Sequence, residues 1–253
     1  MNLELEGRGC VVLGGSRGIG RAIALGLAAE GANVAICARN ETSLRDAEAA
    51  LQQHGGRVFA MACDVADPVA LAAFLDAARA AMGTVDVLVC NASALAAGPS
   101  LADWEASLQV DLMAAVRAGE HVMPWMIEAG GGSILFVSSI SGLEADPMPD
   151  YGYTAAKAAL IAHAKKLAIM HAPHRVRVNA IAPGSTVFAG GVWAMLKEQQ
   201  PEVYEAVRAS IPWGRLGTPE EVANVAVFLV SPRAGWVVGE CVSVDGGQHR
   251  GMR

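Results

Sequence analysis

The feature that most restricts the fold of this chain is a glycine-rich turn near its start. An apolar run at residues 10–13 leads into Gly14, Gly18 and Gly20, and a helical pattern follows at residues 19–30. Glycine tolerates a positive φ and lets the backbone approach a phosphate closely, while a helix start offers free N–H groups to an anion. The order of strand, glycine turn and helix predicts a phosphate-binding turn in an α/β protein. A tight turn without a ligand is the alternative interpretation.

Apolar runs and helical patterns alternate along the whole chain. We expect strands at residues 9–13, 33–38, 57–62, 85–90, 133–137, 176–182 and 241–244, and helices at residues 19–30, 41–53, 68–82, 101–129, 151–171 and 219–229. Continuous apolar strands are typical of a parallel sheet buried on both faces. The alternation predicts a doubly wound, seven-stranded parallel sheet with helices on both faces. A length of 253 residues and 53% hydrophobic content suit one domain spanning residues 1–253.

Charge and cysteine content exclude several classes of function. The net charge is −6 without a basic run, which argues against nucleic acid and anionic membrane as partners. The acidic start lacks a signal-peptide layout, and Pro183 and Gly184 interrupt the longest uncharged stretch, so a cytoplasmic protein is expected. Five cysteines without a C-x-x-C motif indicate small apolar residues in a reducing compartment. His171 and His174 flank Pro173, so we expect a helix end there rather than a metal site.

Tyr153 and Lys157 form a second motif, four residues apart in an alanine-rich helical run. This spacing places both side chains on one face of a helix. A phenol ordinarily ionises near pH ~10, and a nearby cation favours the ionised form. The pair therefore predicts a phenol that can act as a general acid and base. Chance spacing in an ordinary helix is the alternative, and the other motifs weigh against it.

Further motifs fall at the expected ends of strands. They are Asp64-Val65, Asn91-Ala92, Ser139-Ile140-Ser141 and Pro183-Gly184. With the glycine turn and the tyrosine–lysine pair, they make the chain resemble the short-chain dehydrogenase/reductase family over essentially its whole length. The resemblance is to 3-oxoacyl-carrier-protein reductase-like members and to ketone and alcohol oxidoreductases. It implies a Rossmann-type fold that binds a nicotinamide cofactor and interconverts ketones and secondary alcohols.

The resemblance also implies roles for single residues. Tyr153 would be the acid and base, Lys157 would favour the phenolate and bind the nicotinamide ribose, and Ser139 would hold the substrate oxygen. The residues expected at the cofactor are Gly14, Ser16, Arg17, Gly18, Ile19, Gly20, Arg39, Asp64, Val65, Asn91, Ala92, Tyr153, Lys157, Pro183, Gly184 and Thr186. No metal is expected, because the phenol and the serine polarise the substrate oxygen as a zinc ion otherwise would.

The residues after the second strand favour NADP(H) over NAD(H). NAD-dependent enzymes place an acidic residue there, to bind the ribose 2′-hydroxyl. This chain has Ala38 followed by Arg39, with Arg17 inside the glycine turn. Two guanidinium groups suit a 2′-phosphate through charge-assisted hydrogen bonds. Asn40 and Arg45 are candidates for additional contacts. For each arginine alone, a solvated surface position is the alternative.

Three positions depart from the family pattern. Asp111 stands where the family has an asparagine, and we expect its charge to oppose the effect of Lys157 on Tyr153. Leu13 and Cys90 replace a threonine and an asparagine at the ends of strands expected to be neighbours. Losing both polar partners together costs little. These departures leave open an alternative function, in which a catalytically weakened member binds the cofactor as a regulatory or structural protein.

Residues 185–212 form a long connection that predicts a lid over the substrate. Gly190 and Gly191 would supply its hinge. The residues expected to line the substrate site are Ser141, Leu143, Met148, Tyr151 and Trp193. This lining carries no arginine or lysine, so we expect a neutral, hydrophobic ketone or secondary alcohol. An ordinary amphipathic surface helix is the alternative interpretation of the segment.

A homotetramer, or a homodimer, is implied by the resemblance. The predicted helix at residues 101–129 also carries an apolar stripe longer than one sheet face requires. The stripe comprises Trp104, Leu108, Leu112, Val116 and Met123. Packing of these side chains on the sheet of the same chain is the alternative.

Overall fold

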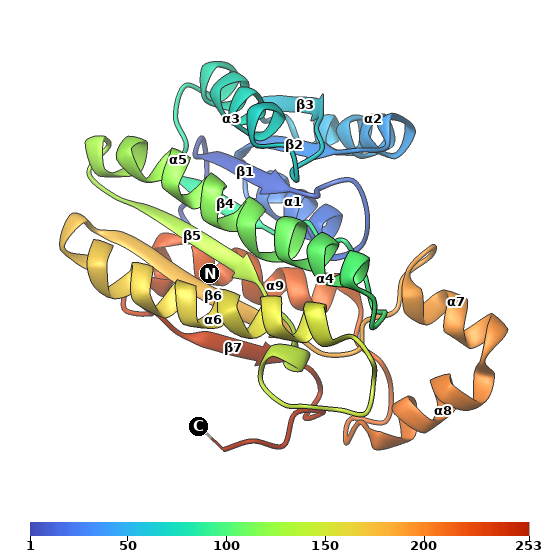
Figure 1. The fold of residues 1–253 in the computed structure, drawn as a ribbon. Coiled ribbons are helices and arrows are strands. Elements are labelled where there is room, and N and C mark those ends of the chain that lie inside the picture. Colours follow the sequence, from blue (N-terminus) through green and yellow to red (C-terminus); the bar gives the residue numbers. More distant parts are fainter. Residues whose placement is uncertain (253) are drawn as a thin grey trace.

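The computed structural model describes residues 1–252 as a parallel sheet with helices on both sides (Figure 1). The seven strands run in the order β3-β2-β1-β4-β5-β6-β7. They are β1 (Gly9–Leu13), β2 (Asn33–Ala38), β3 (Val58–Ala62), β4 (Val87–Cys90), β5 (Gly132–Val137), β6 (Val176–Pro183) and β7 (Cys241–Val244). This arrangement confirms the doubly wound Rossmann-type fold. The order reverses between β1 and β4, where such sheets place their ligands.

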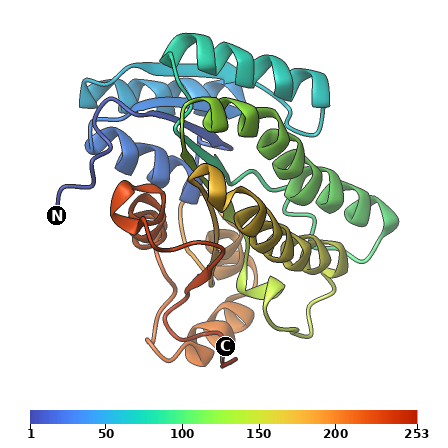
Figure 2. The same cartoon turned by 90° about the vertical axis from the view of Figure 1, so that its left-hand side faces the viewer.

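Alternate residues of the strands belong to two separate hydrophobic cores, because successive side chains of a strand point to opposite faces of the sheet. In β1, Val11 and Leu13 belong to one core, and Cys10 and Val12 belong to the other. The first core packs against α3 (Pro68–Met82), α5 (Ala114–Glu128) and α6 (Tyr151–His171). The second packs against α1 (Gly18–Ala29), α2 (Glu41–Leu51) and α9 (Pro219–Val230). Figure 2 shows the sheet between these two helical layers.

The predicted helix at residues 101–129 is interrupted. It consists of α4 (Leu101–Ser107), a π-helical turn (Leu108–Met113) and then α5. A π-helical turn inserts an extra residue into the hydrogen-bond ladder and is frequent at functional sites. The turn carries Asp111 and directs it inward, where it is buried. Helical periodicity did not reveal the interruption.

The predicted lid contains two short helices, α7 (Val192–Gln199) and α8 (Pro201–Ser210), which project from the body of the domain (Figure 1). Tyr204, Ile211 and Leu216 form a small apolar cluster of their own there, against which Trp193 packs. At the root of this segment, Thr186 forms a parallel bridge with Gly217. The segment therefore has its own packing, separate from the two cores.

Within residues 1–252, no helix is both long enough and apolar enough to span a bilayer. The same residues contain no cluster of three or more metal-ligating side chains. Cys10, Cys37, Cys63 and Cys90 are buried and form no disulfide.

Candidate active site

The glycine turn is fixed by contacts from β2 and from the loop after β4. Gly14 and Gly18 have positive φ values of 74° and 54°. The Gly14 N–H donates to the Cys37 carbonyl at 3.0 Å, and the Asn91 side chain donates to the Gly14 carbonyl at 3.0 Å. A Cβ on Gly14 would lie 2.9 Å from the Cα of Ala92. The positive φ and the close approach of Ala92 therefore require glycine at position 14.

The first turn of α1 faces the same space. Arg17 is the residue before the helix, and its side chain does not cap the free N–H groups. By contrast, Asn40, Asp67 and Thr218 cap the helices that they precede. Uncapped N–H groups at a helix start are suited to bind an anion.

Two exposed arginines border this space. Neither Arg17 nor Arg39 forms an ion pair or a hydrogen bond through its side chain to another of the residues 1–252. Asn40 instead caps α2 by accepting the Ser43 N–H at 2.9 Å, and Arg45 pairs with Glu48 at 2.7 Å. Of Arg17, Arg39, Asn40 and Arg45, only Arg17 and Arg39 have no side-chain partner within residues 1–252.

Lys157 is buried at the centre of the site, with 2% of its surface exposed. Its ammonium lies 3.1 Å from Asp111 Oδ1 and donates to the Val137 carbonyl at 3.0 Å. An ammonium has three N–H donors, and within residues 1–252 only the bond to the Val137 carbonyl engages one of them, so donors remain for a ligand. The nitrogen also lies 5.4 Å from the centre of the Tyr153 ring. The tyrosine and lysine therefore share one face of α6, as their spacing predicts.

Asp111 connects this lysine to the loop after β4. Its Oδ2 accepts the N–H of Ala94 at 3.0 Å, next to Leu95, which has a positive φ of 51°. A carboxylate can accept at both oxygens, whereas an amide can accept at only one. One oxygen of Asp111 thus accepts a hydrogen bond, and the other forms the ion pair with Lys157.

Ser139 lies at the end of β5 and is buried. Its hydroxyl lies 3.3 Å from that of Ser141 and accepts the Ser141 N–H at 3.2 Å. Ser138, which the sequence reasoning did not single out, donates to the Lys157 carbonyl at 2.9 Å. A Cβ on Gly142 would lie 2.7 Å from the carbonyl carbon of Lys157. The serine turn is therefore pressed against α6 beside Tyr153 and Lys157.

The remaining expected residues lie around the rim of the site. Asp64 is exposed after β3 and accepts the Ala66 N–H at 3.0 Å. Thr186 is buried, and its hydroxyl donates to the Gly184 carbonyl at 3.1 Å, so its oxygen can still accept a hydrogen bond. Met148 and Tyr151 are 51% and 56% exposed. They are therefore available to a ligand.

Two observations adjust the expectations for the lid. Trp193 is only half-exposed, because it packs within the lid's own cluster. The Phe188 ring, which was not expected at the site, lies against the glycine turn. A Cβ on Gly18 would be 2.6 Å from this ring. The root of the lid thus contacts the glycine turn directly.

The two apolar departures are neighbours in the sheet. The register pairs Leu13 of β1 with Cys90 of β4, and both are buried. Burial raises the pKa of the Cys90 thiol, so it stays protonated and apolar. The pairing agrees with an exchange of two polar partners for two apolar ones.

Comparisons with known proteins decide the family. A family model described as enoyl-(acyl carrier protein) reductase matches residues 14–249. Isoepoxydon dehydrogenase of Penicillium expansum is 36% identical over 252 residues, covering 98% of this chain and 97% of that protein. The chain belongs to the short-chain dehydrogenase/reductase family. It is accordingly an oxidoreductase of the class that acts on alcohols and ketones.

Other members of the family show the same extent of similarity. The 7α-hydroxysteroid dehydrogenase of Escherichia coli K12 is 33% identical over 251 residues, covering 97% of this chain and 96% of that protein. A solved structure of 7α-hydroxysteroid dehydrogenase with NADH and 7-oxo glycochenodeoxycholic acid has a TM-score of 0.91 and 32% identity, and the match covers 100% of this chain and 98% of that one. The similarity therefore extends from the first strand to the last.

Replacing Asp111 with asparagine tests the role of the buried pair. Asp111→Asn removes the negative charge 3.1 Å from the Lys157 ammonium and keeps one of two acceptors. We expect the protein to fold with a free energy of unfolding lower by about 1–3 kcal/mol. The unopposed ammonium should favour the phenolate, so the rate of alcohol oxidation should rise at lower pH. The pH–rate profile measures this, with the exposed Asp76→Asn as a control. An unchanged profile would show that the Asp111 charge does not influence Tyr153.

Proposed function

We propose that this protein is an NADP(H)-dependent oxidoreductase that interconverts a ketone and a secondary alcohol. One observation carries the proposal. Lys157 is buried and ion-paired, keeps N–H donors beyond the one bonded to Val137, and lies 5.4 Å from the centre of the Tyr153 ring. Burying a charge beside a phenol lowers the stability of the fold, so stability does not explain this arrangement. Proton transfer by a phenol does require it.

The residues divide the chemistry among them. Ser139 donates a hydrogen bond to the substrate oxygen and holds it beside Tyr153. Tyr153 gives its proton to that oxygen in ketone reduction and removes the proton in alcohol oxidation. Lys157 favours the phenolate through its charge and uses its free N–H to bind the nicotinamide ribose. When bound, the nicotinamide supplies the hydride for reduction or takes it up in oxidation.

The glycine turn fits such a cofactor. Gly14 and Gly18 contribute no side chains to the turn, and the start of α1 beside it has no side-chain cap. The Phe188 ring lies against Gly18 and would have to move for a pyrophosphate to bind there. We assign the pyrophosphate to this turn, with the adenosine near Asp64 and Val65 and the nicotinamide near Pro183, Gly184 and Thr186. The unpartnered Arg17 and Arg39 support a 2′-phosphate, hence NADP(H). The solved 7α-hydroxysteroid dehydrogenase of the same family holds NADH.

The substrate is proposed to be a neutral, hydrophobic and cyclic ketone or alcohol. Leu143, Met148 and Tyr151 present an apolar rim, with Trp193 in the lid of residues 185–212 opposite. Names of relatives support a ring: one is a hydroxysteroid dehydrogenase and another is the cis-4-hydroxycyclohexanecarboxylate dehydrogenase of Sinomonas cyclohexanicum. Trp193 would act by shaping the lid cluster as well as by contact.

A second function remains open because of Asp111. Its charge neutralises the lysine at 3.1 Å, which favours a catalytically weakened member that binds cofactor as a regulatory or structural protein. Oxidation of NADPH with a panel of neutral cyclic ketones separates the two functions. Turnover supports the enzyme, whereas cofactor binding without turnover of any ketone supports the alternative.

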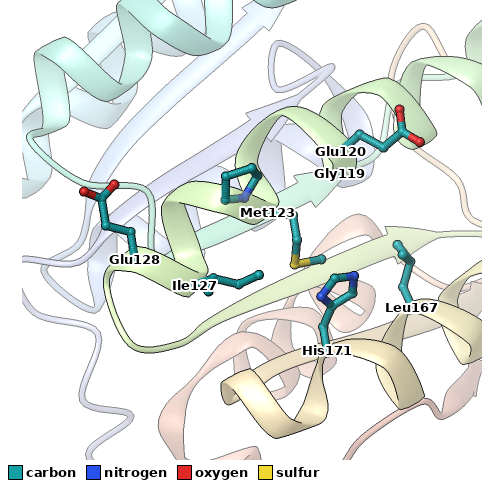
Figure 3. Close-up of a pocket in the computed structure, with 8 residues that line it drawn as sticks. Gly119, Glu120, Met123, Ile127, Glu128, Leu167 and His171 are labelled. Carbon is teal, nitrogen blue, oxygen red and sulfur yellow. The ribbon is translucent and has the colours of Figure 1, made fainter.

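We also propose that the chain forms a homotetramer, or a homodimer, through the face made by α5 and α6. A groove of about 650 Å³ lies there, lined mainly by apolar groups such as Met123, Ile127 and Leu167 (Figure 3). Of the expected apolar stripe, Met123 is buried in the core of the same chain. Glu120 and Glu128 edge the α5 side, and Lys166 and His171 lie on α6. A twofold-related copy can therefore cover the apolar lining of this groove.

Removing the phenolic hydroxyl tests the proton-transfer role. Tyr153→Phe should lower kcat by about 10²-fold or more, because it removes the proton donor and little volume. Cofactor affinity, measured by fluorescence titration, should stay close to that of the unmodified protein. Tyr204→Phe, at a tyrosine in the separate cluster with Ile211 and Leu216, is the matched control. Substantial turnover by Tyr153→Phe would remove Tyr153 from the acid and base role.

The NADP(H) preference depends on charge after β2. Ala38→Asp combined with Arg39→Gln should reverse the preference towards NAD(H), because it adds a ribose acceptor and removes a phosphate partner. Removal of each charge-assisted hydrogen bond should weaken NADP(H) binding by about 1.5–3 kcal/mol. Dissociation constants for both cofactors measure the change, with Arg45→Gln as the control because Arg45 already pairs with Glu48. Tighter binding of NAD(H) by the unmodified protein would contradict the prediction.

Assembly is measured by light scattering at micromolar concentration. The unmodified protein should behave as a tetramer or dimer, and Met170→Glu should shift it to a smaller species, because Met170 is 64% exposed on α6 beside the groove. Met195→Glu, on the lid, is the control. A monomeric unmodified protein would refute assembly. Unchanged assembly of Met170→Glu would refute the choice of this face.

A further inference from the structure

The segment after β7 folds back across the site. Asp245 accepts the N–H of Gly247 at 3.0 Å and that of His249 at 2.8 Å, which closes residues 245–249 into a compact turn. Gly246 and Gly247 have positive φ values of 64° and 83°, as such a turn requires. The turn presents two side chains, Gln248 and His249, to different loops.

Gln248 binds the turn that follows β6. Its Oε1 accepts the N–H of Ser185 at 2.9 Å, and its Nε2 donates to the Ser185 hydroxyl at 3.0 Å. A Cβ on Gly184 would lie 2.8 Å from the same Oε1. Ser185 lies between Gly184 and Thr186, which we assign to the nicotinamide. The Gln248 amide therefore fixes the backbone between Gly184 and Thr186.

His249 binds the loop on the opposite side. Its Nδ1 lies 3.0 Å from Glu144 Oε2, and the Arg250 N–H donates to the same oxygen at 3.3 Å. The His249 side chain is only 9% exposed. Glu144 directly follows Leu143, in the loop that joins the Ser139 turn to Tyr151. This contact therefore fixes the loop expected to border the substrate.

We propose that residues 245–250 form a clasp that joins the two sides of the site, with Gln248 positioning the nicotinamide and His249 positioning the substrate loop. The proposal rests on the proposed function, because it assigns these sides to cofactor and substrate. Neither residue touches the reacting atoms. Each acts through a neighbour: Gln248 through Ser185 and His249 through Glu144.

Cofactor fragments test the Gln248 contact without turnover. Gln248→Met keeps the length of the side chain and removes both hydrogen bonds. It should weaken NADPH binding about tenfold and leave unchanged the affinity for 2′-phospho-ADP-ribose, which lacks the nicotinamide. Gln248→Glu, which can accept from both the N–H and the hydroxyl of Ser185, should restore most of the affinity. Gln53→Met, at an exposed helix end, controls for the chemical change.

The outcomes separate the clasp from the proposed function. If Gln248→Met weakens the binding of NADPH and of its fragment equally, or weakens the binding of neither, the Gln248 role is overturned while the proposed function stands. The affinities of the unmodified protein and of Gln248→Met are also measured for NADH and for ADP-ribose. If the unmodified protein binds neither dinucleotide, the proposed function and the clasp both fail.

The His249 contact is tested by steady-state kinetics with butanone and decalone. His249→Ala should raise KM for decalone more than for butanone and leave kcat and NADPH affinity unchanged. His249→Asn, whose amide keeps a donor near the position of Nδ1, should restore the KM for decalone. His54→Ala, at an exposed histidine, is the control. Equal effects on both ketones, a lower kcat, or failure of His249→Asn to restore KM overturns this role.

Discussion

The buried ammonium of Lys157 is the constraint on which the rest of the site depends. A charge inside a protein must be paired and hydrogen-bonded, because its desolvation is otherwise too costly. The structure meets this need from three elements: the π-helical turn supplies Asp111, β5 supplies the Val137 carbonyl, and α6 carries the lysine itself. Through its other oxygen, Asp111 also fixes the loop after β4. One buried charge therefore holds together the elements that surround the expected substrate.

The fold could be predicted because its signals are local and repeated. Apolar strands, helical periodicity and a glycine turn each depend on a few neighbouring residues, and topology then places the strand ends at one edge. The interruption of the helix at residues 108–113 could not be predicted, because a shift in hydrogen bonding leaves the pattern of apolar residues almost unchanged. For the same reason one predicted helix became α4, a π-helical turn and α5.

The proximity of Tyr153 and Lys157 was predictable, because a local motif carries both residues. Contacts made through the backbone were not. Ser138, Phe188 and Gln248 gain their importance from partners that are distant in sequence, such as the Lys157 carbonyl and the Ser185 N–H. Arg45 shows the reverse case: its position suggested a cofactor contact, but nearby glutamates on α2 engage it. Only the folded chain shows which polar groups are already satisfied.

The distribution of charge links these features to the choice of substrate. At the adenosine end, Arg17, Arg39 and the uncapped start of α1 carry positive charge without a partner. At the reacting end, Asp111 offsets the only buried ammonium described in residues 1–252. The first region suits the phosphates of a dinucleotide, whereas the second offers little net attraction to an anion. In the proposed function, a neutral ketone would need only a hydrogen bond from Ser139 and a proton from Tyr153. The charge of Asp111 is compatible with such a substrate and would disfavour a carboxylate held at the same place.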